Sequence, residues 1–252
     1  MKKVNNIVIT GASSGIGLAL AKTYSSPERN ILILGRNQQR LKQCHQICEK
    51  LGANIVSHIC DIRDHNIINN IISDFDQKYP IDLIIANAGI SGGTSKLGES
   101  YHQLKDIFDT NIYGVINTIN PIIENFKQRK SGQIAIISSI ASFRGLPSAP
   151  AYSASKACIR FYGDALRGDL LPYNVAVNII CPGYIKTPLT DINNFPMPFI
   201  MEVDYAAQYI KKQLSTNKAL IIFPKKLYYL IKLCNLLPIY LSDKIFTKLP
   251  KK

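Results

Sequence analysis

Apolar runs alternate with segments of helix length along most of the chain. The apolar runs are short and rich in β-branched side chains, and they cover residues 4–10, 30–35, 54–59, 82–88, 132–138, 174–180 and 219–223. Such runs are typical of strands that are buried on both faces of a sheet. Candidate helices lie between them, near residues 15–26, 37–51, 64–78, 100–129, 151–171 and 202–216. The alternation predicts an α/β fold with a doubly wound, seven-stranded, mostly parallel sheet and helices on both faces.

The pattern continues without a linker or an internal repeat as far as Phe223. Hydrophobic residues make up 46% of the 252 residues and charged residues 19%, which is typical of a globular protein with a full core. We therefore expect one domain over residues 1–223 and an extension over residues 224–252.

A glycine-rich turn follows the first predicted strand and opens the first predicted helix. Gly11, Gly15 and Gly17 permit a tight turn and let a phosphate approach the backbone, and the start of the helix offers free N–H groups. This placement predicts a dinucleotide site more strongly than glycine spacing alone does, although a loop without a ligand remains the alternative. The other candidate contacts in the turn are Ser13, Ser14 and Ile16.

The end of the second predicted strand bears on the choice of dinucleotide. NAD would require Asp or Glu there to accept hydrogen bonds from the ribose 2′-hydroxyl, but residues 35–40 contain Arg36 and Arg40 and no acid. A guanidinium suits a 2′-phosphate, and Ser13 would add a hydroxyl. The sequence favours NADP(H) over NAD(H), with a solvated arginine at a strand end as the alternative.

Tyr152 and Lys156 are four residues apart in the stretch AYSASKA. On a helix, positions at this spacing share a face, so the phenol and the ammonium would project side by side. A neighbouring ammonium lowers the pKa of a phenol from about 10, which makes the phenol usable as a proton donor and acceptor. The alternative is that both side chains lie on a solvated helix face.

Several motifs in their order along residues 4–223 resemble those of the short-chain dehydrogenase/reductase family, in its single-domain form. The motifs are T-G-x-x-x-G-x-G, an acidic residue after the third strand, N-A-G, a helix asparagine, a serine before the tyrosine, Y-x-x-x-K and P-G-x-x-x-T. In this sequence they are Thr10, Gly11, Gly15, Ile16, Gly17, Asp61, Ile62, Asn87, Ala88, Gly89, Asn111, Ser139, Tyr152, Lys156, Pro182, Gly183 and Thr187. No position of the catalytic set departs from the family's pattern.

The resemblance implies a Rossmann-type fold and an enzyme that transfers hydride between a nicotinamide cofactor and a carbonyl or alcohol substrate, and the arginines after the second strand favour NADP(H) as that cofactor. Tyr152 would be the acid/base, and Lys156 would lower the pKa of the phenol and hold the ribose hydroxyls. Ser139 would hydrogen-bond the substrate oxygen, and Asn111 would hold a water that links Lys156 to solvent.

The resemblance also implies the remaining cofactor contacts and the assembly. Asp61 and Ile62 would meet the adenine, and the N-A-G motif of residues 87–89 would follow the fourth strand. The P-G-x-x-x-T segment, with backbone near Ile185 and with Thr187, would meet the nicotinamide carboxamide. Relatives usually form homodimers or homotetramers through the helices that correspond to residues 100–129 and 151–171.

Two other functions compete with a carbonyl reductase or alcohol dehydrogenase. A non-catalytic NADP-binding sensor or scaffold would keep the fold, but it would be free to lose a member of the catalytic set. A sugar-nucleotide epimerase or dehydratase also uses Y-x-x-x-K, but the residues after Thr187 leave little room for its substrate domain.

The region after Thr187 corresponds to the family's substrate lid and is rich in apolar residues. We expect a hydrophobic ketone, aldehyde or alcohol, with ordinary loop packing as the alternative. The residues that would line the pocket are Phe143, Leu146, Tyr184, Leu189, Phe195, Met197, Phe199, Ile200 and Met201.

The cysteines predict a reducing, cytoplasmic location. All six are scattered and none forms a C-x-x-C pair, which argues against a disulfide framework. Cys44, His45 and Cys48 have no second ligand cluster, so we predict no metal site. The first residues imitate a signal peptide, but glycines and serines interrupt the apolar run, and no apolar run reaches the roughly 18 residues of a membrane span.

The net charge is +13, and nearly half of it lies at the C-terminus. From Pro224 to Lys252 there are seven lysines and one aspartate, with Leu227, Leu230 and Ile231 at helical spacing and a second short helix expected near 241–248. A basic amphipathic segment of this kind either makes peripheral contact with a membrane or packs over the active site or a partner subunit. We expect no nucleic-acid binding, because large aliphatics separate the lysines and no recognition motif is present.

Overall fold

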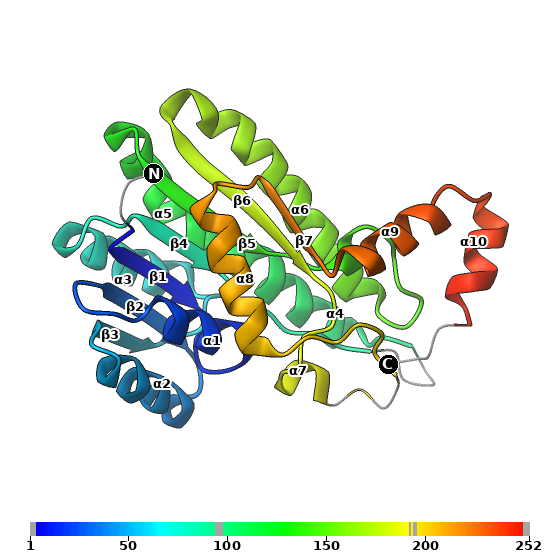
Figure 1. Ribbon diagram of the computed structural model, residues 1–252, viewed down its shortest axis with the longest axis horizontal. Helices are drawn as coiled ribbons and strands as arrows, with labels where there is room; N and C mark the ends of the chain where they lie inside the picture. The colour runs from blue at the N-terminus through cyan, green and yellow to red at the C-terminus, as the bar shows by residue number, and fades with distance from the viewer. Residues whose placement is uncertain (1–3, 94–97, 192, 194–195, 249–252) are drawn as a thin grey trace.

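The computed structural model describes residues 4–93, 98–191, 193 and 196–248. A seven-stranded parallel sheet forms its centre (Figure 1), with strand order β3-β2-β1-β4-β5-β6-β7. The strands are β1 (Asn6–Thr10), β2 (Asn30–Gly35), β3 (Asn54–Ile59), β4 (Leu83–Ala86), β5 (Gly132–Ile137), β6 (Val175–Pro182) and β7 (Leu220–Phe223). The predicted doubly wound sheet is thus confirmed.

Helices cover both faces of the sheet because successive strand side chains point to opposite sides. In β1, Ile7 and Ile9 pack beneath one helix layer, whereas Val8 packs beneath the other. The first layer contains α1 (Gly15–Tyr24), α2 (Gln38–Lys50) and α8 (Val203–Ser215), and the second contains α3 (His65–Lys78), α5 (Gly114–Arg129) and α6 (Pro150–Leu170). This double covering explains why most strands are apolar at every position.

Three features differ from the predicted elements. The segment expected as one helix over 100–129 is divided into α4 (Tyr101–Phe108) and α5 by a π-helical turn at Asp109–Tyr113. The strand β3 lies at the edge of the sheet and is largely exposed rather than buried on both faces. The short helix α7 (Pro188–Asp191) was not expected.

The chain continues after β7 into two further helices, α9 (Lys225–Cys234) and α10 (Ile239–Phe246). Leu227 and Ile231 of α9 pack against Ile140, which follows β5, while α10 stands away from the sheet (Figure 1). No helix in the described part of the chain is long and apolar enough to cross a membrane.

Helix α6 carries both Tyr152 and Lys156, and a glycine sets its distance from the sheet. A Cβ atom on Gly163 would lie 2.9 Å from Ile179 Cγ1 and 3.0 Å from Ile136 Cδ1, on β6 and β5. The helix therefore rests directly on the two strands, and the position of both candidate catalytic side chains depends on this contact.

We expect Gly163→Ala to destabilise the protein by about 1–3 kcal/mol, because the added methyl group overpacks the contact between helix and sheet. Gly168→Ala in the same helix is the matched control: a Cβ atom there meets nothing within 4 Å. It should stabilise the protein by up to about 1 kcal/mol through helix propensity alone. Urea unfolding measures both values, and equal effects of the two substitutions would contradict the role of Gly163.

Candidate active site

A cavity of about 1170 Å³ opens at the carboxyl edge of the sheet. It is lined by the glycine-rich turn, the ends of β2 to β6, helix α6 and both C-terminal helices. The carboxyl edge of a doubly wound sheet is where ligands bind in such folds. Most of the candidate site residues, although far apart in sequence, therefore surround one space.

The glycine-rich turn forms the floor of one end of the cavity. Gly11 and Gly15 have φ angles of +68° and +54°, which residues with a side chain rarely adopt. Gly17 does not line the cavity; a Cβ atom there would lie 2.3 Å from the Gly11 carbonyl oxygen, so this glycine lets α1 approach the turn closely. The residues of the turn that line the cavity are Gly11, Ser13, Ser14, Gly15 and Ile16.

The turn is fixed to the end of β4 by hydrogen bonds. The Thr10 hydroxyl accepts from the N–H groups of Asn87 and Ala88, at 3.1 and 3.2 Å. The Asn87 amide donates back to the Thr10 carbonyl at 2.9 Å. Asn87, Ala88 and Gly89 thereby line the cavity beside the turn.

Positive side chains line the cavity at the end of β2, beside the glycine-rich turn. Arg36 lines the cavity with 54% of its side chain exposed, and Arg40 and Ser13 line the same end. A Cβ atom on Gly35 would lie 3.2 Å from the Ser13 hydroxyl oxygen, so the end of β2 touches the turn. The guanidinium of Arg36 also lies 3.6 Å from an oxygen of Asp61.

Asp61 and Ile62 line the cavity as predicted, but Asp61 has a partner that the sequence did not reveal. Arg63 donates to its carboxylate from the backbone N–H and from the guanidinium, at distances of 2.7 to 3.0 Å. Burial by itself would raise the pKa of Asp61, but the hydrogen bonds and charge of Arg63, with the charge of Arg36, lower the pKa overall. The carboxylate is therefore charged and fixed in place.

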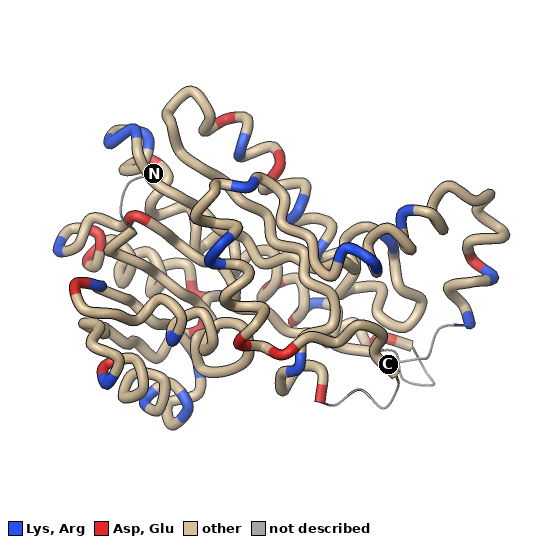
Figure 2. Tube along the Cα trace, viewed as in Figure 1, with Lys and Arg blue, Asp and Glu red and all other residues tan. Residues whose placement is uncertain are grey.

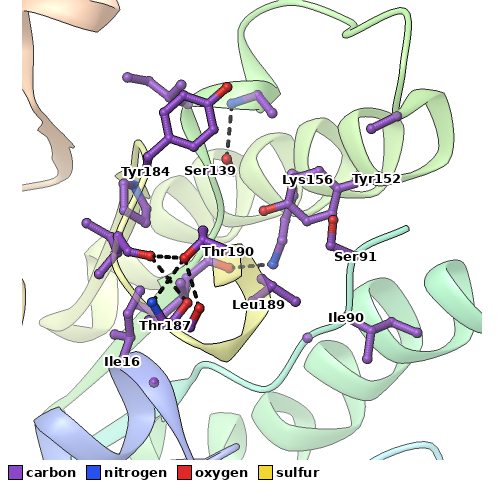
Figure 3. A pocket seen from close by; sticks show the side chains of 18 of the residues that line it. Ile16, Ile90, Ser91, Ser139, Tyr152, Lys156, Tyr184, Thr187, Leu189 and Thr190 are labelled. Atoms are coloured by element: carbon purple, nitrogen blue, oxygen red, sulfur yellow. Dashed lines mark hydrogen bonds between the residues drawn. The ribbon is translucent and has the colours of Figure 1, made fainter. Parts of the chain in front are cut away.

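Tyr152 and Lys156 both face the cavity from α6 (Figure 3). The alternative of a solvated helix face is wrong, because Lys156 is only 4% exposed. Its Nζ lies 5.9 Å from the centre of the Tyr152 ring and donates to the Ile137 carbonyl at 3.1 Å.

The expected lowering of the Tyr152 pKa by Lys156 is not found in the structure. Burial raises the pKa of Tyr152, and its hydrogen bond with Ser139 offsets part of the rise. Burial also lowers the pKa of Lys156, to about 8. The cause is that both groups lose water on burial, and Lys156 Nζ donates to the neutral carbonyl of Ile137.

Ser139 stands at the end of β5 beside Tyr152 and is 9% exposed. Its hydroxyl accepts from the N–H of Ala141 at 3.1 Å, at the start of a single 3₁₀ turn. The turn thus fixes the serine oxygen, and the same hydroxyl forms a hydrogen bond with Tyr152.

Asn111 lies behind the cavity wall rather than in it and is fully buried. Within the π-helical turn, its amide donates to the Ile90 carbonyl and the Ser155 hydroxyl and accepts from the Ile90 N–H, at 2.8 to 3.0 Å. A Cβ atom on Gly89 would lie 3.0 Å from Asn111 Oδ1 and 3.2 Å from Lys156 Nζ, so both polar groups lie close to this glycine. Ser155 is the contact that the sequence did not reveal.

The segment after β6 closes another side of the cavity. Thr190, which was not predicted, donates to the Ile185 carbonyl at 2.7 Å and accepts from the Thr187 N–H at 3.0 Å. Thr187 in turn lies against Gly15 of the glycine-rich turn. The predicted residues of this segment that line the cavity are Pro182, Gly183, Ile185 and Thr187.

The apolar end of the cavity differs in part from the expected lid. Three of the expected residues line it, and they are Leu146, Tyr184 and Leu189. Five others do not line it: Phe143, Met197, Phe199, Ile200 and Met201. Phe195 lies outside the described residues. Phe199 and Ile200 are exposed instead. The missing wall is supplied by α9 and α10, through Leu227, Leu230, Ile231, Cys234, Ile245 and Phe246. The two helices therefore pack over the cavity of the candidate site, in agreement with one of the two alternatives for this segment.

These residues fit a nicotinamide dinucleotide. The turn can bring a pyrophosphate close to the backbone, because Gly11 and Gly15 have positive φ angles and Gly17 lets α1 approach the turn closely. Helix α1 begins without a side-chain cap, so its first backbone N–H groups are left for the pyrophosphate. Arg36 and Arg40 supply positive charge at one end, and Ser139, Tyr152 and Lys156 lie further along the same space. No group of three or more metal-binding side chains occurs within the part of the chain that the structure describes.

Comparisons with known proteins agree with this geometry. The family model described as short chain dehydrogenase matches residues 5–195. The chain is 33% identical over 237 residues to an uncharacterized oxidoreductase of Myxococcus xanthus, and the match covers 94% of each protein.

Two solved structures have a similar fold. One is a short chain dehydrogenase/reductase of Burkholderia phymatum in complex with NAD, with a TM-score of 0.84 at 17% identity, covering 99% of this chain and 97% of that chain. The other is the actinorhodin polyketide ketoreductase with NADPH, with a TM-score of 0.79 at 22% identity, covering 88% and 97%.

The pKa of Lys156 makes the stability of the fold depend on pH. The unfolded chain, with a lysine pKa of about 10.5, binds this proton more tightly than the folded chain, with a pKa of about 8. The contribution of Lys156 to the free energy of unfolding is therefore most favourable above about pH 10.5 and is lost as the pH falls to about 8. We expect the unfolding free energy of the wild type minus that of Lys156→Met to rise by a few kcal/mol across this window.

Chemical denaturation at a series of pH values measures this difference. Lys212→Met, at an exposed position of α8, is the control and should give a flat difference across the same pH range. A flat difference for Lys156→Met as well would show that burial does not perturb the lysine.

Proposed function

The chain belongs to the short-chain dehydrogenase family, and from this premise we propose that it is an NADP(H)-dependent oxidoreductase that interconverts a carbonyl group and an alcohol. One observation carries the proposal: Ser139, Tyr152 and Lys156 face the same cavity as the glycine-rich turn of Gly11 and Gly15. A bound dinucleotide and a carbonyl substrate would therefore share one space.

The proposed roles follow from the atoms that face the cavity. NADP(H), when bound, supplies or receives the hydride. In reduction, the Tyr152 phenol donates its proton to the carbonyl oxygen, and the Ser139 hydroxyl donates a hydrogen bond to the same oxygen. The ammonium of Lys156 stabilises the phenolate that remains, while Asn111, which also lies close to Gly89, holds the water through which the proton is replaced.

The raised pKa of Tyr152 supports this direction of proton transfer. A phenol that stays protonated through neutral pH is ready to donate, and burial is the cause of the rise. A positive charge brought near the phenolate by Lys156 in the reacting complex would then favour the loss of the proton.

The proposal extends to cofactor preference, NADP(H) rather than NAD(H). Arg36 is half-exposed, and its nearest acid, Asp61, is already bonded by Arg63. The guanidinium is therefore available to a 2′-phosphate. Similar folds have been solved with either cofactor, so the support comes from the side chains of this chain.

The substrate, assembly and location belong to the same proposal. The apolar wall that includes Leu146 and Tyr184 supports a hydrophobic ketone, aldehyde or alcohol. A homodimer or homotetramer through α5 and α6 is consistent with the exposed ring of Phe161. All six cysteines are free thiols, which supports a reducing, cytoplasmic location, with peripheral membrane contact through residues 224–252.

We expect Tyr152→Phe to lower carbonyl reduction at least about a hundredfold, because the substrate oxygen loses its proton donor. The loss of NADPH absorbance with graded ketones and aldehydes measures this, and NADPH binding should be retained. Tyr162→Phe, on the same helix but outside the cavity, is the matched control and should keep its activity. Full activity in Tyr152→Phe would contradict the assigned role, and tight NADPH binding by a wild type without turnover would favour a sensor.

We expect Arg36→Leu to lower kcat/KM for NADPH by about tenfold to a hundredfold, because a charge-assisted hydrogen bond to the 2′-phosphate is lost. The value for NADH, which has no such phosphate, should change little. Lys42→Leu removes a positive charge from α2 outside the cavity and should affect neither. A parallel loss with NADPH and NADH would contradict a phosphate-specific role for Arg36.

A further inference from the structure

The helices α9 and α10 have an inner apolar face that belongs to the cavity. Leu227, Ile231, Cys234 and Phe246 are at most 9% exposed, and all four line it. Leu227 and Ile231 pack against Ile140, the residue that follows Ser139. The apolar end of the cavity therefore begins beside the proposed catalytic serine.

The same two helices and the turn between them have a second apolar face that the protein does not cover. Nine large apolar side chains between Tyr229 and Ile245 are exposed, among them Leu233 at 62%, Leu236 at 76% and Ile239 at 72%. A concentration of this kind on one projecting element marks an interaction surface rather than ordinary exposure.

The charges around this outer face decide which partner it suits. The five lysines in the described part of residues 224–252 are all exposed, and they are Lys225, Lys226, Lys232, Lys244 and Lys248. Figure 2 shows basic positions along both α9 and α10. The only acid between residues 224 and 248 is Asp243, which is paired with Arg144. Contact between two copies of this face would bring lysines together without acids to compensate them. Anionic lipid headgroups would neutralise the positive charge of these lysines, and the acyl chains would pack against the exposed leucines and tyrosines.

The outer face and the cavity share side chains. Leu230 and Ile245 are 54% and 42% exposed on the projecting helices, and both also line the cavity. The mouth of the cavity therefore opens within the apolar surface. A chain-like substrate that lay in a lipid layer against this surface would reach Ser139 and Tyr152 along an apolar wall.

We propose that α9 and α10 lie in an anionic membrane surface and that the active site takes its substrate from the lipid phase, a long-chain aldehyde or ketone. This inference rests on the proposed oxidoreductase function. The balanced reaction for an aldehyde adds a hydride from NADPH to the carbonyl carbon and a proton from Tyr152 to the oxygen, giving a primary alcohol and NADP⁺. The alkyl chain lies against Leu227, Ile231 and Phe246 and extends past Leu230 into the lipid.

The first test is flotation of the full chain with vesicles of phosphatidylcholine, with and without phosphatidylglycerol. We expect binding only to the vesicles that contain the anionic lipid, and loss of binding in Leu236→Glu/Ile239→Glu, whose positions are exposed and outside the cavity. The control Ile47→Glu/Ile67→Glu, at exposed positions of α2 and α3, should float like the wild type. A wild type that does not float, with an oligomer that Leu236→Glu/Ile239→Glu dissociates, would overturn the inference in favour of a second copy.

The second test compares hexadecanal in the anionic vesicles with butanal in solution. We expect Leu236→Glu/Ile239→Glu to lower kcat/KM for hexadecanal by about tenfold or more, equivalent to about 1.4 kcal/mol, and to leave butanal reduction unchanged. Equal effects on both aldehydes, or no preference of the wild type for the vesicle-bound aldehyde, would overturn the lipid-phase substrate. Butanal reduction without vesicles tests the oxidoreductase function alone, so the two failures are distinguishable.

Discussion

The hydrogen bonds between the end of β1 and the end of β4 are the interaction on which the site depends. The strand order reverses between these neighbours, because the chain runs outward from β1 to β3 before it returns to β4, and a crevice opens at such a point. The Thr10 hydroxyl and the Asn87 amide join the two strand ends across it. These hydrogen bonds fix the glycine-rich turn beside the segment that contains Gly89, and Asn111 and Lys156 lie close to Gly89.

The electrostatics of the site follow from burial at that crevice. Lys156 projects from a helix that rests on β5 and β6. Its ammonium is buried there and donates a hydrogen bond to the carbonyl of Ile137. A buried ammonium with one neutral partner is poorly stabilised, which is why its pKa falls to about 8. The same loss of water raises the pKa of Tyr152. Burial thus favours the neutral form of both groups, and the charged form of each would be stabilised by a partner of opposite charge in the reacting complex.

The sequence was sufficient for the sheet and for the glycine-rich turn, because both leave local signals. Buried parallel strands are apolar at each position, and the turn before α1 needs glycines at fixed points. Contacts that depend on the path of the chain left no such signal. The bonds from Arg63 to Asp61, from Asn111 to Ser155 and from Thr190 to Ile185 form only because a loop or a π-helical turn brings the partners together. The edge position of β3 follows from the strand order, which no single segment encodes.

The C-terminal helices show why an amphipathic pattern alone left two alternatives. Spacing identifies one apolar face of a helix, but α9 and α10 with the turn between them are apolar on two sides. The side with Leu227 and Ile231 is buried against Ile140, whereas the side with Leu233, Leu236 and Ile239 is exposed. Since the body of the protein covers only one side, the proposed anionic lipid surface accounts both for the second apolar side and for the lysines that surround it.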